Sequence, residues 1–460
     1  MKTNLLKFLL QIIALLVFVA CSRVGETENR PNVVDEFVEV SALTKAINTQ
    51  LPPIVSTPKS TQRIHVFIEN SGSMNGYINS ASDFQMAIGR AIQLMKFKYG
   101  EDNIKVYYIN TKISERVRPV GTDLYVFVQQ MLDRKQFTAT GNTSSTDLNQ
   151  VVKNVLDSVD NNNTAILISD FIYSLPSSNG VTTSLLYGCQ NLTMSAFLQK
   201  TNQLPSGMSL ATNIVQLYSN FNGRYWHWEK PTGNQYVNLN CSRPYYMCIM
   251  GTDDEVKSFN KSVDISSLRG YKNQFTISNK DVSKAEYTVF NTKYKKGNYR
   301  HKNLNSICDI FDVKKNSRGE FELGVGINLS NFSMSESDKV DISNYQVNSG
   351  NYEIIKVEPI DTLTITNPTD IKLVRNNNIT HAIVLRCTGF PNDISIAIKR
   401  SLPVWVKETS SIDDRNIGKD TDQQRKTFGL SYFVEGISDA YNYLAQDKQN
   451  FMSINIKVTN

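Results

Sequence analysis

The chain has 460 residues, of which 40% are hydrophobic and 20% are charged, and its formal net charge is +6. This length allows about three domains of ordinary size or two large ones, and the apolar content is sufficient for packed cores. No segment concentrates lysine and arginine into a basic stripe, so the sequence gives no support to a nucleic-acid partner.

The N-terminus has the pattern of a secretory signal. Two lysines precede an apolar run over residues 8–20 that is broken only by Gln11, and this run is shorter than the roughly 20 residues that a membrane span needs. Cys21 follows directly, and the junction resembles the lipobox of bacterial lipoproteins. The resemblance implies a signal peptide over residues 1–20 and a lipidated Cys21 that anchors the chain in the cell envelope, preferentially at the outer membrane. An uncleaved N-terminal anchor helix is the alternative.

Residues 21–60 are polar and contain four prolines, a composition typical of a spacer. From residue 61 to residue 265 the pattern changes to apolar runs that alternate with amphipathic stretches. Continuous apolar runs are typical of strands that are covered on both faces. They predict strands over residues 64–68, 104–109, 165–169, 214–218 and 245–250.

Helix signals lie between these predicted strands. Ser82 and Gln85 form the pattern of a capping box, and apolar residues then recur at helical spacing up to Met95. Residues 148–159 carry a second apolar stripe, and residues 124–132 form a shorter apolar helix. This alternation predicts an α/β domain with a doubly wound, Rossmann-like parallel sheet, which binds ligands beyond the carboxyl ends of its strands.

Residues 270–460 have a different character. Alternating segments at residues 321–327, 352–357, 362–366, 382–385, 394–398 and 454–458 predict strands. One amphipathic stretch, over residues 432–444, predicts a helix. The charged run over residues 408–426 lacks periodicity and is interpreted as a solvated loop. This half is therefore predicted to be an all-β, sandwich-like domain with one packed helix.

The first predicted strand ends in a motif that carries chemistry. Glu69 is followed by Ser71 and Ser73, and alternate residues of an extended loop can face the same cation. The motif resembles the metal-ion-dependent adhesion site of von Willebrand factor A (VWA) domains, whose first element is Asp-x-Ser-x-Ser. Glu69 replaces the aspartate and places its carboxylate one methylene further from the backbone.

The same resemblance implies two further metal ligands. The stretch from Gly141 to Thr146 resembles the Gly-x-Thr loop of the family, which gives Thr143 the role of the threonine ligand. Asp170 follows the strand at residues 165–169, as the last aspartate of the family does, and Phe171 stands where the family often has glycine. Two carboxylates and three hydroxyls suit a hard cation such as Mg²⁺, or Ca²⁺ or Mn²⁺. A site that binds no ion and only hydrogen-bonds its loops together is the alternative.

These observations predict an envelope lipoprotein, not an enzyme, that binds a protein partner through a possibly metal-dependent VWA-like face. A structural subunit with a degenerate metal site is the first alternative, and a hydrolase with its site in the β-rich half is the second. The four histidines are scattered, and no zinc motif, nucleophile elbow or phosphate loop supports the hydrolase. The cysteines outside the signal leave disulfide pairing open.

Overall fold

The fold is taken from a computed structural model, and the described residues all belong to the compact unit Lys59–Asn460. The signal peptide, the spacer, Cys21 and Thr143 lie outside the described residues. The described residues are 62–78, 82–110, 112–139, 146–175, 182–228, 236–280, 286–301, 309–330, 332, 334, 336–348, 350–400, 402–445 and 449–459.

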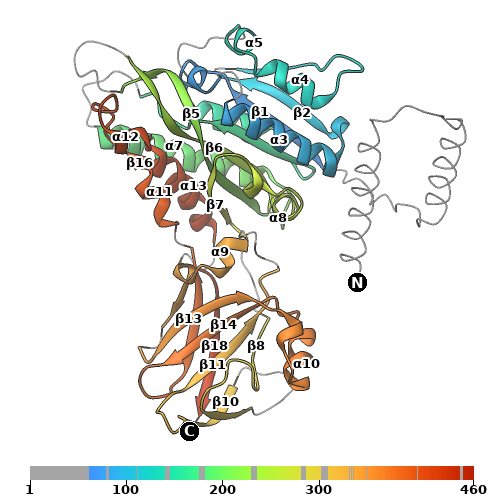
Figure 1. The fold of residues 1–460 in the computed structure, drawn as a ribbon, viewed down its shortest axis with the longest axis vertical. Coiled ribbons are helices and arrows are strands. Elements are labelled where there is room, and N and C mark those ends of the chain that lie inside the picture. The colour runs from blue at the N-terminus through green and yellow to red at the C-terminus, as the bar shows by residue number, and fades with distance from the viewer. Residues whose placement is uncertain are drawn as a thin grey trace, which may run out of the picture. The chain divides into compact units, whose positions relative to one another are not determined.

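A seven-stranded mixed sheet forms the α/β part of the structure (Figure 1). Strand β1 pairs in parallel with both β2 and β4, whereas the other neighbours are antiparallel. The predicted parallel sheet is therefore mixed, although the α/β class is correct. The strands, in their order across the sheet, are β3 (Ile113–Glu115), β2 (Ile104–Ile109), β1 (Arg63–Glu69), β4 (Asn163–Ser169), β6 (Tyr236–Thr252), β5 (Leu210–Trp226) and β7 (Tyr271–Ser278).

Helices cover both faces of this sheet because its strands are apolar on both sides. Side chains of α3 and α4 share one buried core with Val66 and Ile68, and those of α6 and α7 share a second core with Phe67. The predicted capping box of α3 is present, with Ser82 and Gln85 bonding each other's backbone. The helices are α3 (Asp83–Tyr99), α4 (Leu124–Met131), α5 (Arg134–Thr138), α6 (Leu148–Asp157), α7 (Thr182–Gln203) and α8 (Asp253–Ser262), with 3-10 turns η1 (Ser73–Tyr77), η2 (Glu101–Asn103) and η3 (Ile265–Ser267).

Part of the C-terminal half completes the α/β core. Helix α13 (Leu430–Leu444) matches the helix predicted over residues 432–444, but it packs against α7, and its Phe433, Ile437 and Tyr441 belong to the core on the α7 side of the sheet. The helix therefore does not pack within the β-rich half, where its place in the sequence predicts it. The segment before it comprises α11 (Val404–Glu408), β16 (Ser410–Ser411), α12 (Thr421–Gln424) and β17 (Thr427–Phe428).

The segment over residues 408–426 is docked on the sheet, so its interpretation as a solvated loop was wrong. Arg243 donates hydrogen bonds to the carbonyl oxygens of Gln424 (3.1 Å) and Lys426 (3.4 Å). Asp414 accepts one from the backbone N–H of Trp228 at 3.0 Å, and Ile417 is buried in the core on the α3 side. High charge and the absence of periodicity did not indicate a solvated loop here, because the segment makes most of its contacts through its backbone carbonyl groups.

Two further sheets form the β-rich part and share one buried core. Strand β18 returns from α13 and pairs with β15 and β10. The predicted strand over residues 362–366 is wrong, because Thr362–Thr364 form the 3-10 turn η5 under an Asp361 cap. The first sheet runs β12 (Tyr345–Val347), β15 (Ile394–Lys399), β18 (Asn450–Thr459), β10 (Asp309–Lys314) and β9 (Asn298–His301); the second runs β13 (Tyr352–Pro359), β14 (His381–Cys387), β11 (Glu322–Ile327) and β8 (Tyr287–Val289). The remaining elements are α9 (Glu336–Val340), η4 (Ile342–Asn344) and α10 (Pro368–Asn376).

Within the described ranges, no helix combines the length and the apolar character needed to cross a membrane.

Candidate functional site

The carboxyl ends of β1 and β4 bring the sequence-predicted residues together. These neighbouring parallel strands pair Ile68 with Ile168, so Glu69 and the residues after Ile168 emerge at the same edge of the sheet. Glu69 and Asp170 are both buried, with 4% and 2% of their surfaces exposed. We call Glu69, Ser71, Ser73 and Asp170 the strand-end cluster.

The two carboxyl groups of the strand-end cluster influence each other. Burial raises the pKa of Glu69 to about 7, the charge of Asp170 adds to this rise, and the hydroxyls of Ser169 and Ser71 oppose it. Burial likewise raises the pKa of Asp170, against the effect of a hydrogen bond from Ser73. Two desolvated carboxylates at one position favour either a shared proton or a cation.

The two serines face each other at the start of the η1 turn. Their hydroxyl oxygens are 3.0 Å apart, and the Met74 N–H closes the turn on the carbonyl oxygen of Ser71 at 3.1 Å. Ser71 contacts the Glu69 carboxyl and Ser73 contacts the Asp170 carboxyl. The spacing of two residues therefore places one hydroxyl beside each acid.

Thr143, the predicted threonine ligand, lies outside the described residues. Thr146, at the end of the same stretch, is described and buried. Its hydroxyl is near enough to Glu69 to lower the pKa of that carboxyl, yet Oγ1 has no hydrogen-bond partner of regular geometry among the described residues. Thr146 therefore brings a further oxygen to the site that the motif comparison did not assign.

Phe171 adopts an uncommon backbone conformation beside Asp170. Its φ angle is 52°, in the left-handed region that glycine tolerates and other residues rarely adopt. The Phe171 ring is buried, with its centroid 4.8 Å from that of Phe433 and 5.9 Å from that of Tyr246. The packing of the ring explains how phenylalanine is held in this conformation.

Sequence reasoning missed two other residues at this edge. Ser169, directly before Asp170, donates a short hydrogen bond to Glu69 Oε2, and its position at a strand end was the available signal. Arg243 is 99% buried, since its exposed fraction is 1%, and its charge lowers the pKa of Asp170. No local signal identifies Arg243, because it reaches the site from a strand more than 70 residues further along the chain.

The β5–β6 hairpin fixes the η1 turn. Tyr77 donates a hydrogen bond to the carbonyl oxygen of Pro244 at 2.5 Å. Gly223 lies so close to Gly76 that a Cβ atom on Gly223 would be 2.6 Å from the Gly76 Cα. Only glycine permits this approach of two backbones, so the hairpin holds the serine-bearing turn in place.

The donor set of the strand-end cluster fits a hard cation. It offers two carboxylates and two hydroxyls, with the Thr146 oxygen nearby, and such neutral and anionic oxygens are the ligands of Mg²⁺ and Ca²⁺. The described residues contain no group of three or more His, Cys, Asp or Glu side chains that could hold a metal. A metal here would therefore depend on hydroxyl oxygens as ligands. The single positive charge of Arg243 balances only one of the two carboxylates, which leaves one negative charge for a cation.

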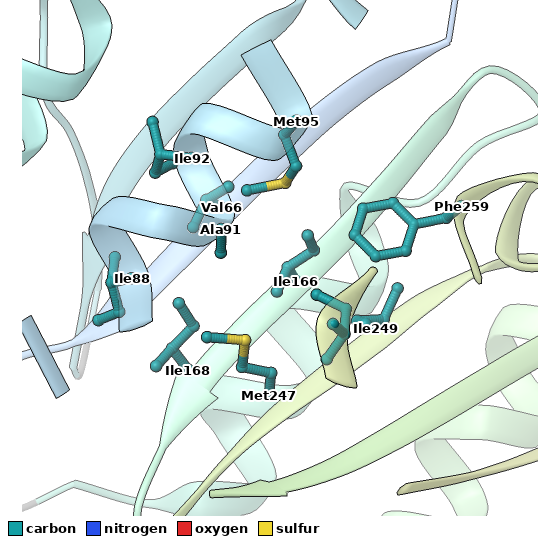
Figure 2. A pocket seen from close by; sticks show the side chains of 11 residues that line it. Val66, Ile88, Ala91, Ile92, Met95, Ile166, Ile168, Met247, Ile249 and Phe259 are labelled. Atoms are coloured by element: carbon teal, nitrogen blue, oxygen red, sulfur yellow. The ribbon is translucent and has the colours of Figure 1, made fainter. Parts of the chain in front are cut away.

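A small cavity in the core of the α/β part has no chemistry of its own. It lies between α3 and the sheet, has a volume of about 10 Å³ and is lined entirely by apolar side chains (Figure 2). Such a volume is about the space of one water molecule. We interpret it as a packing defect of the core.

Comparison of the chain with protein-family models, with curated proteins and with solved structures gave no match.

Proposed function

We propose that the chain is an envelope lipoprotein that binds a protein partner through a VWA-like face, with the strand-end cluster holding a divalent cation. The observation that carries this proposal is the meeting of Glu69, Ser71, Ser73 and Asp170 at one edge of the sheet. The parallel pairing of β1 with β2 and β4 supports a VWA-like, doubly wound arrangement for this half of the sheet. The lipid on Cys21 would hold the chain to the membrane.

The cation would be Mg²⁺, Ca²⁺ or Mn²⁺, held by the strand-end cluster with Thr143. When bound, it would supply an electrophilic position that accepts an acidic group of the partner. The protein's own residues do the rest: Ser71 and Ser73 orient toward the two acids, and burial removes competing water. Such a site binds and has no need of a catalytic step.

The buried Arg243 favours a second candidate, a structural subunit with a degenerate site. Its charge balances Asp170, and the pKa of Glu69 near 7 allows that carboxyl to keep a proton. Proton and guanidinium together would neutralise the cluster without an ion. The two candidates differ in whether a divalent cation stabilises the folded chain.

Thermal melting separates these candidates. A cation that binds only the folded state raises stability by about 2.7 kcal/mol at a hundredfold excess over its dissociation constant. We expect Mg²⁺, Mn²⁺ or Ca²⁺ to raise the melting temperature of the full-length chain relative to chelator, and Asp170→Ala to abolish the rise. Glu69→Asp should strengthen the response to Mg²⁺ if the extra methylene weakens the site.

Glu255→Gln is the matched control. Glu255 is also a carboxyl whose pKa burial raises to about 7, but it lies in the first turn of α8 at the opposite edge of the sheet. Glutamine can keep its capping bonds to Thr252. This variant should retain the full response to cations. An unchanged melting curve of the wild type with every ion, together with a lower melting temperature of Asp170→Ala in chelator, would refute the metal site and favour the structural subunit.

Partner binding is tested by pulldown from envelope extracts with and without chelator. The proposal expects a protein that is retained in Mg²⁺, is released by chelator and is not retained by Asp170→Ala. A protein retained equally by wild type and Asp170→Ala in chelator would contradict a metal-dependent face.

A further inference from the structure

Strands β5 and β6 form a long hairpin (Figure 1) that continues past the end of β4. Ser169, the last residue of β4, pairs with Tyr246 of β6, whereas β5 and β6 continue to pair with each other as far as Trp226 and Tyr236. Tyr236 precedes Tyr246 by ten positions. At about 3.3 Å per residue, the far end of the hairpin lies about 30 Å beyond the end of β4.

The two faces of this extension differ completely. The inner face carries Phe221, Tyr225 and Leu239, which are buried in the core together with Ile417 of the docked C-terminal segment. The outer face is exposed. Three cross-strand pairs form it, and we call them the outer ladder: Asn222 with Asn240, Arg224 with Asn238, and Trp226 with Tyr236.

The composition of the outer ladder is unusual for a water-exposed surface. Trp226 and Tyr236 are 41% and 37% exposed, and their ring centroids are 5.1 Å apart. The Arg224 guanidinium lies 4.5 Å from the centroid of the Tyr236 ring. The ladder contains no acidic and no aliphatic side chain. Among the described residues, none of the three asparagine amides makes a side-chain hydrogen bond to another side chain or to the backbone.

We propose that the outer ladder binds a saccharide. A sugar ring presents C–H groups that pack on aromatic faces, and hydroxyls that pair with amides able to donate and accept at once. Two adjoining rings, tilted by 58° to each other, and three amides on one face of the ribbon supply both kinds of contact. The single cation, Arg224, adds an attraction for a sugar that carries a carboxylate or a sulfate.

Other ligand classes match the outer ladder less well. The hot spots of protein interfaces also use Trp, Tyr and Arg, but their fully buried core is mainly apolar, whereas half of the ladder residues are asparagines. A nucleic-acid strand requires several cations along its backbone, whereas the ladder has one. Saccharide binding here does not depend on the strand-end cluster or on a bound cation.

The experiment uses the purified full-length chain in a buffer free of sugar-based detergent. The wild type is applied to an array of immobilised neutral and acidic oligosaccharides, and the best-retained saccharide is then titrated while tryptophan fluorescence is recorded. We expect saturable binding that Trp226→Ala weakens at least tenfold, because large aromatic side chains dominate such contacts. Trp226→Tyr keeps a ring and should lose much less. Arg224→Ala should weaken acidic saccharides more than neutral ones.

The matched control is Phe97→Ala, which removes an aromatic ring that is 91% exposed on α3. It should bind as the wild type does. Cross-strand aromatic pairs also stabilise two-stranded ribbons, so the melting temperature of each variant is measured to confirm that it folds. Asn238→Ala tests the ladder without changing a ring.

The proposal is overturned if the wild type retains no saccharide. It is also overturned if Trp226→Ala and Asn238→Ala bind as tightly as the wild type. Binding that chelator and Asp170→Ala abolish while the ladder variants keep it would place the saccharide at the strand-end cluster and overturn the proposal as well.

Discussion

Replacing Phe171 separates two opposing contributions at the edge of the sheet. Its left-handed backbone, with φ at 52°, costs an L-residue about 1–2 kcal/mol. Its ring is almost completely buried against Phe433 and Tyr246, and truncating a buried phenylalanine to alanine costs about 3–5 kcal/mol. Phe171→Ala should therefore lower the free energy of unfolding by about 3–5 kcal/mol, because it loses the packing and keeps the strain.

Phe171→Gly loses the same packing but removes the strain. Glycine adds backbone entropy to the unfolded chain, which costs about 0.4–1 kcal/mol. The difference between strain relieved and entropy added leaves Phe171→Gly about 0.5–1 kcal/mol more stable than Phe171→Ala. This order is the reverse of the usual one, since glycine is normally the less stable of the two in regular structure.

Urea unfolding in chelator measures both variants, with Phe433 as the matched control. Phe433 lies inside α13 and packs on the same ring, but a helical position favours alanine over glycine by about 1 kcal/mol. Phe433→Gly should therefore be less stable than Phe433→Ala, opposite to the order at position 171. If glycine is the less stable residue at both positions by a similar margin, the strain at Phe171 is not real and this reasoning fails.

Two further predictions concern other parts of the chain. Burial raises the pKa of Glu255 from its usual 4.5 to about 7, so the folded state holds this proton more tightly and stability falls as the pH rises from 4.5 through 7. Glu255→Gln should remove that part of the fall and raise the free energy of unfolding by about 1–2 kcal/mol at pH 8, after allowance for partial solvent screening. If the melting temperatures of variant and wild type change with pH in the same way across this range, the pKa shift is contradicted. Cys21→Ala should move the chain from the membrane fraction to the soluble fraction or leave it uncleaved, whereas unchanged membrane retention with an intact N-terminus would support the anchor-helix alternative.

Local signals in the sequence determined the centre of the sheet and the position of the candidate site. The apolar runs at residues 64–68, 104–109 and 165–169 became β1, β2 and β4, and the capping box began α3 where it was expected. Because β1 and β4 are parallel neighbours, Glu69 at the end of β1 and Asp170 after β4 lie at the same edge of the sheet. A strand end and a residue spacing predicted Glu69, Ser71 and Ser73 at one position, and the resemblance to VWA domains implied that Asp170 joins them.

Helix α7 shows where local signals fail. Its apolar residues do not recur along one face, so no periodicity indicated a helix over Thr182–Gln203. The long antiparallel hairpin of β5 and β6 was seen only as two short runs, since the polar residues of its outer ladder interrupt the apolar pattern. The prediction of an all-parallel sheet was wrong for a different reason. The direction of a strand depends on which neighbour it pairs with, and a local pattern does not record this.

Only the tertiary structure decided what surrounds the strand-end cluster. Arg243 arrives from β6, Phe433 supports Phe171 from α13, and the segment over residues 408–426 closes on the hairpin. Each contact joins residues that are far apart in the chain. Their formation depends on burial shared between distant elements, which no local pattern records. The sequence therefore located the acids and hydroxyls of the site, whereas the fold set their pKa values, their charge balance and the backbone strain beside them.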